Sequence, residues 1–381
     1  IFNIRLDRDS IEKANNINEL ENHCLKKKLS FYLKEPNFIY YFEEFIKNNK
    51  DVYFYYNCTI KDVIVQNNKV RSIEISNVNN KVSSVIGDEF VLSMGTYGNN
   101  QFLLSLKEKE PNFLKSERIG KHIHDHIGVE VGNVEIYDKK GFRNHFENAF
   151  YNGSKYQAKI LNKNGNLSIS GQFNDKNNLD PHVAEIKKFI KNFFFRIKIN
   201  YDKRKISLKG LFLFSKFIWH WIFTKKILNF TSKNILFYVQ SEQSVIDINI
   251  IKINKKQNND KNFLKEISFK WKFKDEDFEE ITKFTHNVDI FLRKNRLGKI
   301  DCFDLSPDFF KNNMESTYHL SGGTIIAKDI NSGVCDKSFK VWGVDNLYIS
   351  GASLFPCSGS ANITMTILAT ALKLSKKLKT L

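Results

Sequence analysis

A histidine beside a glycine turn is the residue of this sequence best suited to acid–base chemistry. His319 stands two residues before the stretch Ser321-Gly322-Gly323-Thr324, whose glycines allow a backbone to approach a ligand closely. Histidine titrates near neutral pH, so a positioned imidazole can take a proton from a hydroxyl group. A lone histidine near a glycine turn is also compatible with a purely structural role, and the surrounding pattern has to decide between the two.

A second group of small and polar residues follows a predicted strand. The apolar run at 346–350 leads into Gly351-Ala352-Ser353, and the carboxyl end of a strand is the usual ligand position in an open α/β sheet. Asn362 then stands at the start of a helix predicted over 363–377, where asparagine is a favourable N-cap. We therefore expect Asn362 to act as a helix cap.

Other histidines give weaker signals. His124-Asp125-His126 has the composition of a metal or acid–base cluster, and a structural role is the alternative that we favour. His220 lies between two tryptophans with no motif around it, which indicates a structural or interfacial role.

The elements that must position these residues can be located by their patterns. Residues 1–50 have a mostly helical pattern. After the run at 90–92, which is typical of a buried strand, a glycine turn at 95–98 and the apolar residues 102–106 predict a ligand-cradling strand–turn–helix. Apolar periodicity over 278–292 predicts an amphipathic helix whose aromatic residues are core contacts. The remaining predicted strands are 52–56, 60–65, 70–75, 235–239, 245–253 and 267–273.

Composition limits the class of protein. The chain has 381 residues, 41 % of them hydrophobic, which suits one large globular domain or two ordinary ones. Its five cysteines are far apart and include no CxxC pair, so we expect no metal site, no disulfide framework and a reducing, cytoplasmic setting. The net charge of +17 suits either an anionic partner or lysines spread over every face. No aromatic–basic pattern of a nucleic-acid-binding module accompanies it, so no nucleic acid is expected.

One stretch combines basic and large apolar residues. Residues 211–223 contain LFLF, FIW and WIF, but Lys216 and His220 interrupt them, and the apolar part is too short to span a bilayer. Three interpretations stay open: a helix in a membrane interface, a buried helix, and a lid over a substrate pocket.

The ordered motifs near the carboxyl terminus resemble those of the glucose–methanol–choline (GMC) family of flavoprotein oxidoreductases. They are His319, Gly333-Val334-Cys335-Asp336, Gly343-Val344-Asp345-Asn346-Leu347, Gly351-Ala352-Ser353, Phe355-Pro356 and Asn362. Upstream, similar pieces are the strand at Ile60, the turn with Gly95 and Thr96, the element Gly120–His126, Glu242-Gln243 and Trp271. The sequence departs from the family where Ile325-Ile326 replaces the frequent Arg-Met and where Ile363, in place of Pro, follows Asn362.

The resemblance implies a fold of the α/β plus α+β class, with an incomplete, Rossmann-like FAD-binding domain and an antiparallel-sheet substrate domain. We expect a helical segment over 1–50, parts of the FAD-binding domain at 51–130 and 319–381, and a substrate or cap domain at 131–318. The family's Gly-rich βαβ unit has no counterpart here, no GxGxxG occurs and the first residue is Ile1, so an N-terminally truncated chain is expected.

The resemblance also implies a function and a site. It implies an FAD-dependent oxidoreductase that oxidises the CH–OH group of a small alcohol or sugar by hydride transfer to the flavin, with His319 as the base and Asn362 as a substrate ligand. The implied FAD contacts are Ile60, Gly95, Thr96, Gly351, Ala352, Ser353, Asn362 and Ile363. The electron acceptor stays open. Two alternatives are a non-catalytic remnant or subunit that binds a partner, and a peripheral membrane protein that works through 211–223.

Overall fold

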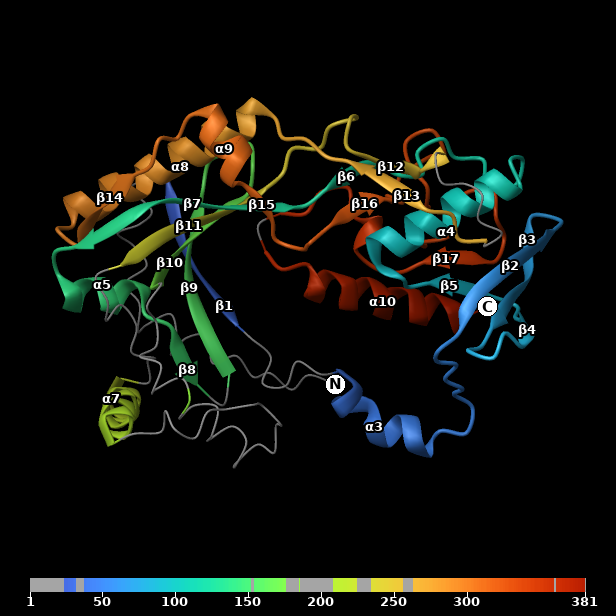
Figure 1. The fold of residues 1–381 in the computed structure, drawn as a ribbon, viewed down its shortest axis with the longest axis horizontal. Coiled ribbons are helices and arrows are strands. Elements are labelled where there is room, and N and C mark those ends of the chain that lie inside the picture. The colour runs from blue at the N-terminus through green and yellow to red at the C-terminus, as the bar shows by residue number, and fades with distance from the viewer. Residues whose placement is uncertain are drawn as a thin grey trace. The chain divides into compact units, whose positions relative to one another are not determined.

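The computed structural model describes residues 24–31, 38–151, 154–175, 185, 208–224, 234–255, 263–359 and 361–380. The chain divides into two compact units. Unit 1 comprises 1–45, 129–240 and 278–313, and unit 2 comprises 46–128, 241–277 and 314–381. Figure 1 traces the elements of both along the chain.

Unit 1 is built on a sheet with antiparallel strand pairs, in which the spatial order of the strands differs from their order in the sequence. Its strand order is β1 (Leu25–Phe31), β9 (Ser154–Asn162), β10 (Ile169–Asp175), β11 (Ile235–Glu242), β7 (His126–Ile136) and β14 (Gly298–Cys302), with β8 (Ala149–Tyr151) paired to β9. The registers of β1 with β9, β9 with β10 and β7 with β14 are antiparallel. Strands β7, β10 and β11 are buried along most of their length, which places this sheet in the core of unit 1.

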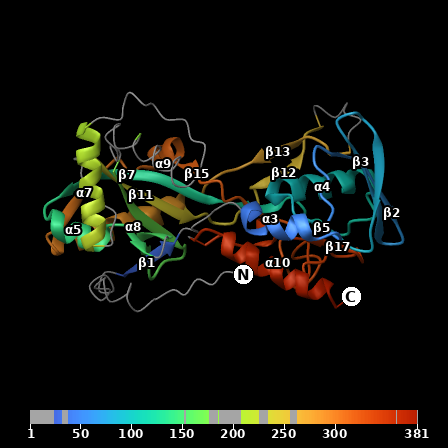
Figure 2. The same cartoon turned by 90° about the horizontal axis from the view of Figure 1, so that it is seen from below.

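Helices complete unit 1. They are α5 (Lys139–Phe146), α7 (Leu208–Thr224), α8 (Asp275–Lys294) and α9 (Pro307–Asn313). The helix predicted over 278–292 is confirmed as α8, and its apolar stripe is buried, with the ring of Phe284 stacked 6.1 Å from that of Phe237 on β11. His220 of α7 bonds to Glu147, the C-cap residue of α5, with a Nε2–Oε2 distance of 3.0 Å. Figure 2 shows the ribbons of α7 and α5.

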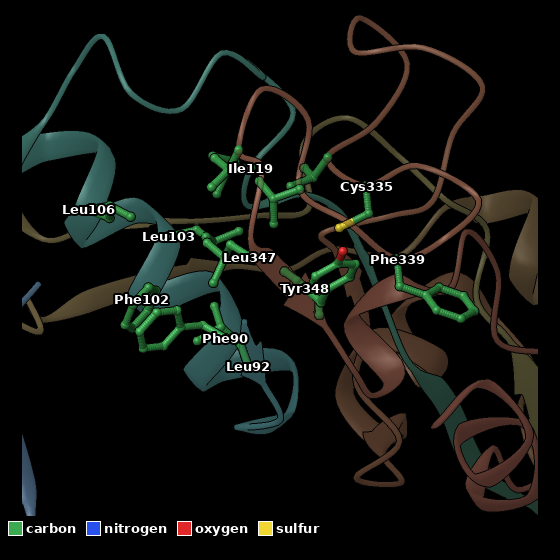
Figure 3. Packing of buried hydrophobic residues seen from close by; sticks show 14 of the residues in the cluster. Phe90, Leu92, Phe102, Leu103, Leu106, Ile119, Cys335, Phe339, Leu347 and Tyr348 are labelled. Carbon is green, nitrogen blue, oxygen red and sulfur yellow. The ribbon is translucent and has the colours of Figure 1, made fainter. Parts of the chain in front are cut away.

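Unit 2 contains the strand–turn–helix predicted around the glycine turn. Strand β5 (Phe90–Leu92) pairs in parallel with β17 (Leu347–Ile349), and helix α4 (Gly95–Lys109) follows β5. Leu92 and Leu347 pack with Phe102, Leu103 and Leu106 of α4 in one buried cluster (Figure 3). The turn after β17 forms a short 3₁₀ helix, η3 (Ala352–Leu354), and the final helix is α10 (Thr364–Leu378).

Four small strand groups surround this parallel pair. β2 (Thr59–Gln66), β3 (Lys69–Ser76) and β4 (Val82–Ile86) form a meander, and β12 (Ile250–Ile253) pairs with β13 (Ile267–Lys270). β16 (Ser321–Gly323) pairs with β6 (Lys121–His124). β15 (Glu315–Ser316) pairs with the first residues of β7. The last two pairings hold the candidate site.

The structure corrects several local predictions. Residues 52–56 form no strand, and the tyrosines there are exposed, because β4 supplies the third strand of the meander. The strands predicted over 245–253 and 267–273 shorten to β12 and β13. Within residues 1–50, which were predicted to be mostly helical, the structure has the strand β1 and the helix α3 (Phe38–Asn48). Residues 1–23 and 32–37 lie outside the described residues.

Candidate active site

Strand pairings on both sides hold His319 in place. Upstream, β15 pairs with β7, with Ser316 opposite Ile127, and the amide of Thr317 donates to the carbonyl oxygen of His126 at 3.0 Å. Downstream, β16 pairs with β6. Between the two, Tyr318 adopts the left-handed conformation (φ 62°) with its side chain exposed, which is uncommon outside glycine. The kink at Tyr318 turns the half-buried His319 out of line with β15.

The carboxylate of Asp125 fixes the backbone around this kink. It is buried, and its Oδ1 accepts hydrogen bonds from the amides of His126 (2.7 Å) and His319 (2.8 Å). Its Oδ2 accepts from the hydroxyl of Ser316 at 2.5 Å. A buried carboxylate with three donors is well satisfied, and each donor would be orphaned without it. Asp125 therefore positions His319, as the structural interpretation of the 124–126 cluster predicted.

The hydroxyl of Thr317 determines which nitrogen of His319 carries the proton. Thr317 Oγ1 lies 3.0 Å from the carbonyl oxygen of His126 and 3.0 Å from His319 Nδ1. A carbonyl oxygen only accepts, so the single hydroxyl proton points to it, and Oγ1 must accept from Nδ1–H. In this tautomer Nε2 of His319 carries the lone pair and is the basic nitrogen.

His126 lies against His319 as a neutral ring. The ring centroids are 4.9 Å apart, and His126 Nε2 donates to the carbonyl oxygen of Ser358 at 3.1 Å. Burial lowers the pKa of His126 below its usual value of 6.5, and the charge of a protonated His319 would lower that pKa further. His319 is therefore supported by an uncharged neighbour.

His124 and the glutamine of the Glu242-Gln243 pair extend the network behind His319. Burial lowers the pKa of His124, whose Nδ1–H donates to the carbonyl of His122 at 2.9 Å. Gln243 Oε1 accepts from the amide of Asp125 (3.2 Å) and from the indole Nε1–H of Trp271 (2.8 Å). The motifs at 120–126, 242–243, 271 and 319, which are far apart in the sequence, thus meet in one hydrogen-bonded group.

Two glycine turns at the carboxyl ends of β5 and β17 form a second part of the site. Gly95 has φ 70° and Gly351 φ 120°; a Cβ on Gly95 would meet no atom within 4 Å, and one on Gly351 only Asn99 Nδ2, at 4.0 Å. These glycines therefore face open space. Helix α4 begins at Gly95 without a side-chain cap on its first amides, and uncapped N–H groups at a helix start favour negative charge. These donors fit a flavin or phosphate group.

Two buried asparagines that the sequence analysis did not single out join the turns together. Asn99 Oδ1 accepts from the amide of Met94, and its Nδ2 donates to the carbonyl of Ser350 and the hydroxyl of Ser353. Asn100 Nδ2 donates to the carbonyls at 96 and 322, and its Oδ1 accepts from the amide at 120. A pair of asparagines one turn into an otherwise apolar helix is the signal that would have identified them.

The glycines after His319 serve the chain's own packing. Gly322 and Gly323 are buried with φ near +87°, and a Cβ on them would collide with the His122 carbonyl and with the Asn100 side chain, respectively. These contacts lie within the chain, and the expectation that this turn brings backbone close to a ligand stays a prediction. The two glycines are required because β6 and α4 approach closely.

The remaining predicted contacts are placed as follows. Thr96 is buried and donates to the carbonyl of Leu320 (2.6 Å), next to His319, while Ala352 and Ser353 are buried in η3. Ile60 is partly buried on β2; its cross-strand neighbour lines a cavity of about 390 Å³ beside β3 and β4. That cavity contains none of the predicted site residues.

Asn362 differs from its expected role as a helix cap. Helix α10 begins at Thr364, and the buried Ile363 occupies the N-cap position with no side-chain cap bond. The cap prediction is wrong because residues 361–363 form a turn one residue longer than expected before the helix. Asn362 is exposed, and the described residues show no contact between it and His319, so their catalytic pairing stays a prediction.

In the described ranges, no group of three or more His, Cys, Asp or Glu side chains is placed to hold a metal ion. In the same ranges, no helix has both the length and the apolar character needed to cross a bilayer.

Comparison with known families identifies the segment that carries this geometry. Residues 249–371, which include His319, Gly351 and Asn362, match the family model described as GMC oxidoreductase. About a third of the chain therefore matches a GMC oxidoreductase family model. The motif-based resemblance is thereby confirmed. No curated protein matches the chain.

Solved structures of GMC enzymes share the fold over a larger range. Formate oxidase from Aspergillus oryzae RIB40, described for its FAD modification, is 16 % identical, with a TM-score of 0.53 over 88 % of this chain and 62 % of its own. Pyridoxine 4-oxidase from Mesorbium loti is 10 % identical, with a TM-score of 0.52 over 84 % and 57 %. The chain thus spans about three-fifths of the length of these proteins, and the likeness establishes a fold of mixed α/β content with antiparallel sheets.

Proposed function

We propose that this chain is the catalytic part of an FAD-dependent oxidoreductase acting on the CH–OH group of a small alcohol or sugar. The observation that carries the proposal is the set of hydrogen bonds that positions His319 and determines its tautomer. Asp125 holds its backbone, Thr317 holds Nδ1–H, and Nε2 is left as a base in a segment that matches the GMC family. FAD, when bound, supplies the hydride acceptor.

The chain's own residues supply positioning and proton transfer. The uncapped start of α4 and the open glycines Gly95 and Gly351 would hold the flavin, with Thr96, Ala352 and Ser353 shaping the turns. Nε2 of His319 takes the substrate hydroxyl proton, while the neutral ring of His126 beside it avoids charge repulsion. Ile60, Asn362 and Ile363 are further proposed contacts to FAD or substrate.

The decisive experiment is flavin reduction in the flavin-loaded protein. The enzyme is mixed anaerobically with a panel of primary alcohols, polyols and sugars. Formate and pyridoxine are included because they appear in the names of the structurally similar oxidases. We expect at least one compound to bleach the flavin in the wild type and in His286→Ala, an exposed histidine on α8, and none to do so in His319→Ala. Bleaching retained in His319→Ala would remove His319 from the role of base.

A second function is favoured by apolar surface in unit 2. The parallel pair β5–β17 has only two strands, whereas parallel sheets are normally larger and covered on both faces. Met365 and Leu372 of α10 and Val91 of β5 are exposed. A non-catalytic subunit that docks a partner supplying further strands would use this surface. A folded chain that binds no FAD alone would favour this alternative.

A cytoplasmic setting is proposed together with this function. All five cysteines are free thiols, four of them exposed, which suits a reducing compartment. Mass measurement after thiol alkylation of protein taken directly from cells tests it: five modified cysteines are expected, and a disulfide would contradict the proposal.

A further inference from the structure

Helix α7 of unit 1 exposes a stripe of large apolar side chains. Leu208, Leu211, Phe212, Trp219, Ile222 and Phe223 are all exposed, and their spacing of three and four residues places them on one face of the helix. Trp219 and Phe223 stack on that face with ring centroids 5.5 Å apart, and 60 % and 74 % of the two residues is exposed. The buried-helix interpretation of 211–223 is therefore wrong for these residues.

One flank of α7, beside the apolar stripe, is anchored to the protein. His220 is half-buried and bonds through Nε2 to the buried carboxylate of Glu147, which also lies 3.7 Å from Arg143 Nε. This contact fixes the rotation of α7 about its axis. The apolar stripe therefore points away from the protein. An exposed face made of several large apolar side chains marks an interaction site.

Charge identifies the partner. Residues 186–226 contain twelve lysines and arginines and a single acidic residue, Asp202, and α7 itself contains no acidic residue. Lys216 is exposed with its Nζ 4.8 Å from the centroid of the Phe212 ring, so its ammonium lies at the margin of the apolar stripe. Tryptophan and phenylalanine flanked by lysine are typical of a helix that lies in the headgroup region of a bilayer.

We propose that α7 docks the protein on an anionic membrane surface, lying in the plane of the interface with Trp219 and Phe223 inserted. The helix has 17 residues and does not cross the bilayer. Basic residues on both sides of it supply attraction to acidic lipid headgroups, which falls with ionic strength. The proposal is independent of the flavin site, because it uses no residue of unit 2.

The test is co-sedimentation of the intact chain with vesicles of phosphatidylcholine, with or without 30 % phosphatidylserine (about a third, enough for a negative surface potential). We expect binding to the anionic vesicles and at least roughly tenfold weaker binding to neutral ones or at 0.5 M salt. Trp219→Ser/Phe223→Ser should weaken binding to anionic vesicles by roughly tenfold or more.

A matched pair of substitutions controls for lost surface hydrophobicity. Ile222 on α7 and Ile290 on α8 are 46 % and 44 % exposed. Ile222→Asp should abolish sedimentation with anionic vesicles, and Ile290→Asp should leave it unchanged. Absent binding, equal binding to neutral vesicles, or equal loss in both aspartate variants would overturn the proposal. So would sedimentation velocity showing that the stripe is covered in a stable dimer.

Discussion

Replacement of Thr317 by valine tests whether a single hydroxyl sets the tautomer of His319. Valine keeps the shape of threonine and leaves the backbone hydrogen bond from residue 317 to His126 intact, because that bond uses the main-chain amide. What disappears is the acceptor 3.0 Å from His319 Nδ1. The hydroxyl's own bond to the carbonyl oxygen of His126 is lost as well, but that oxygen keeps the amide of residue 317 as a donor, so the main change is the loss of the acceptor for Nδ1–H.

The size of the effect follows from the orphaned donor. A partly buried N–H that loses its acceptor costs about 1–3 kcal/mol. The Nδ1–H tautomer should therefore lose its advantage by a factor of roughly 5 to 150. The Nε2–H tautomer cannot accept the hydroxyl proton at Nε2, so the rate of flavin reduction in a loaded enzyme should fall with the population of the Nδ1–H tautomer, by up to a similar factor.

Nitrogen NMR of ¹⁵N-histidine-labelled protein measures the tautomer directly, without flavin or substrate. His319→Asn identifies the resonances among the nine histidines of the chain. The wild type should show a protonated Nδ1 and an unprotonated Nε2 near pH 8, and Thr317→Val should shift the population toward protonated Nε2. Thr324→Val is the matched control, since Thr324 is buried and its hydroxyl has no partner among the described residues. An Nε2–H tautomer in the wild type, or an unchanged spectrum in Thr317→Val, would refute the reasoning.

Three further outcomes are expected. Gly351→Ala should cost about 1–2 kcal/mol of unfolding free energy, because the backbone there is left-handed, and should prevent flavin binding. Gly322→Ala should cost more unfolding free energy, because its Cβ collides with a backbone carbonyl. Urea unfolding measures the two free energies, and flavin absorbance measures binding. Asp125→Ala should destabilise the chain by about 3 kcal/mol or more, since three donors lose their acceptor. Asp125→Asn keeps two of these hydrogen bonds and should destabilise the chain by about 1 kcal/mol. Similar losses of stability in both variants would contradict the role given to Asp125. Burial lowers the pKa of His124 and His126 below 6.5, so the unfolded chain binds more protons than the folded one as pH falls below that value. The free energy of unfolding should be full above pH 6.5 and should fall below it by up to about 1.4 kcal/mol per pH unit for each histidine. A free energy of unfolding that rises on acidification would exclude this effect.

The sequence predicted those parts of the site whose signal is local. The run at 90–92, the glycine turn after it and the apolar spacing of the next helix predicted β5 and α4, because a strand–turn–helix is encoded within some twenty residues. The stripe of α8 was equally clear, since its period is visible in the sequence. His319 was singled out from the order of motifs around it, and the structure then supplied its partners.

Other features depend on contacts between distant segments and had no local signature. The role of Thr317 depends on where the carbonyl of His126 lies, and the role of Asn99 depends on the approach of residues 350–353. The aromatic run at 52–56 has strand-forming residues, but in the part of the chain that the structure describes, β4 is the third strand of the meander. The need for glycine at 322 and 323 arises from the close approach of β6 and α4, which sequence alone does not show.

Titration of the chain with FAD tests the central claim most directly. Binding is followed by quenching of flavin fluorescence in the wild type, in Gly351→Val and in Gly87→Ala, a glycine before β5 whose added Cβ would make only ordinary contacts. The account predicts saturable binding of one FAD to the wild type and to Gly87→Ala, and none to Gly351→Val. Saturable binding that persists in Gly351→Val, or a folded wild type that binds no FAD, would contradict it.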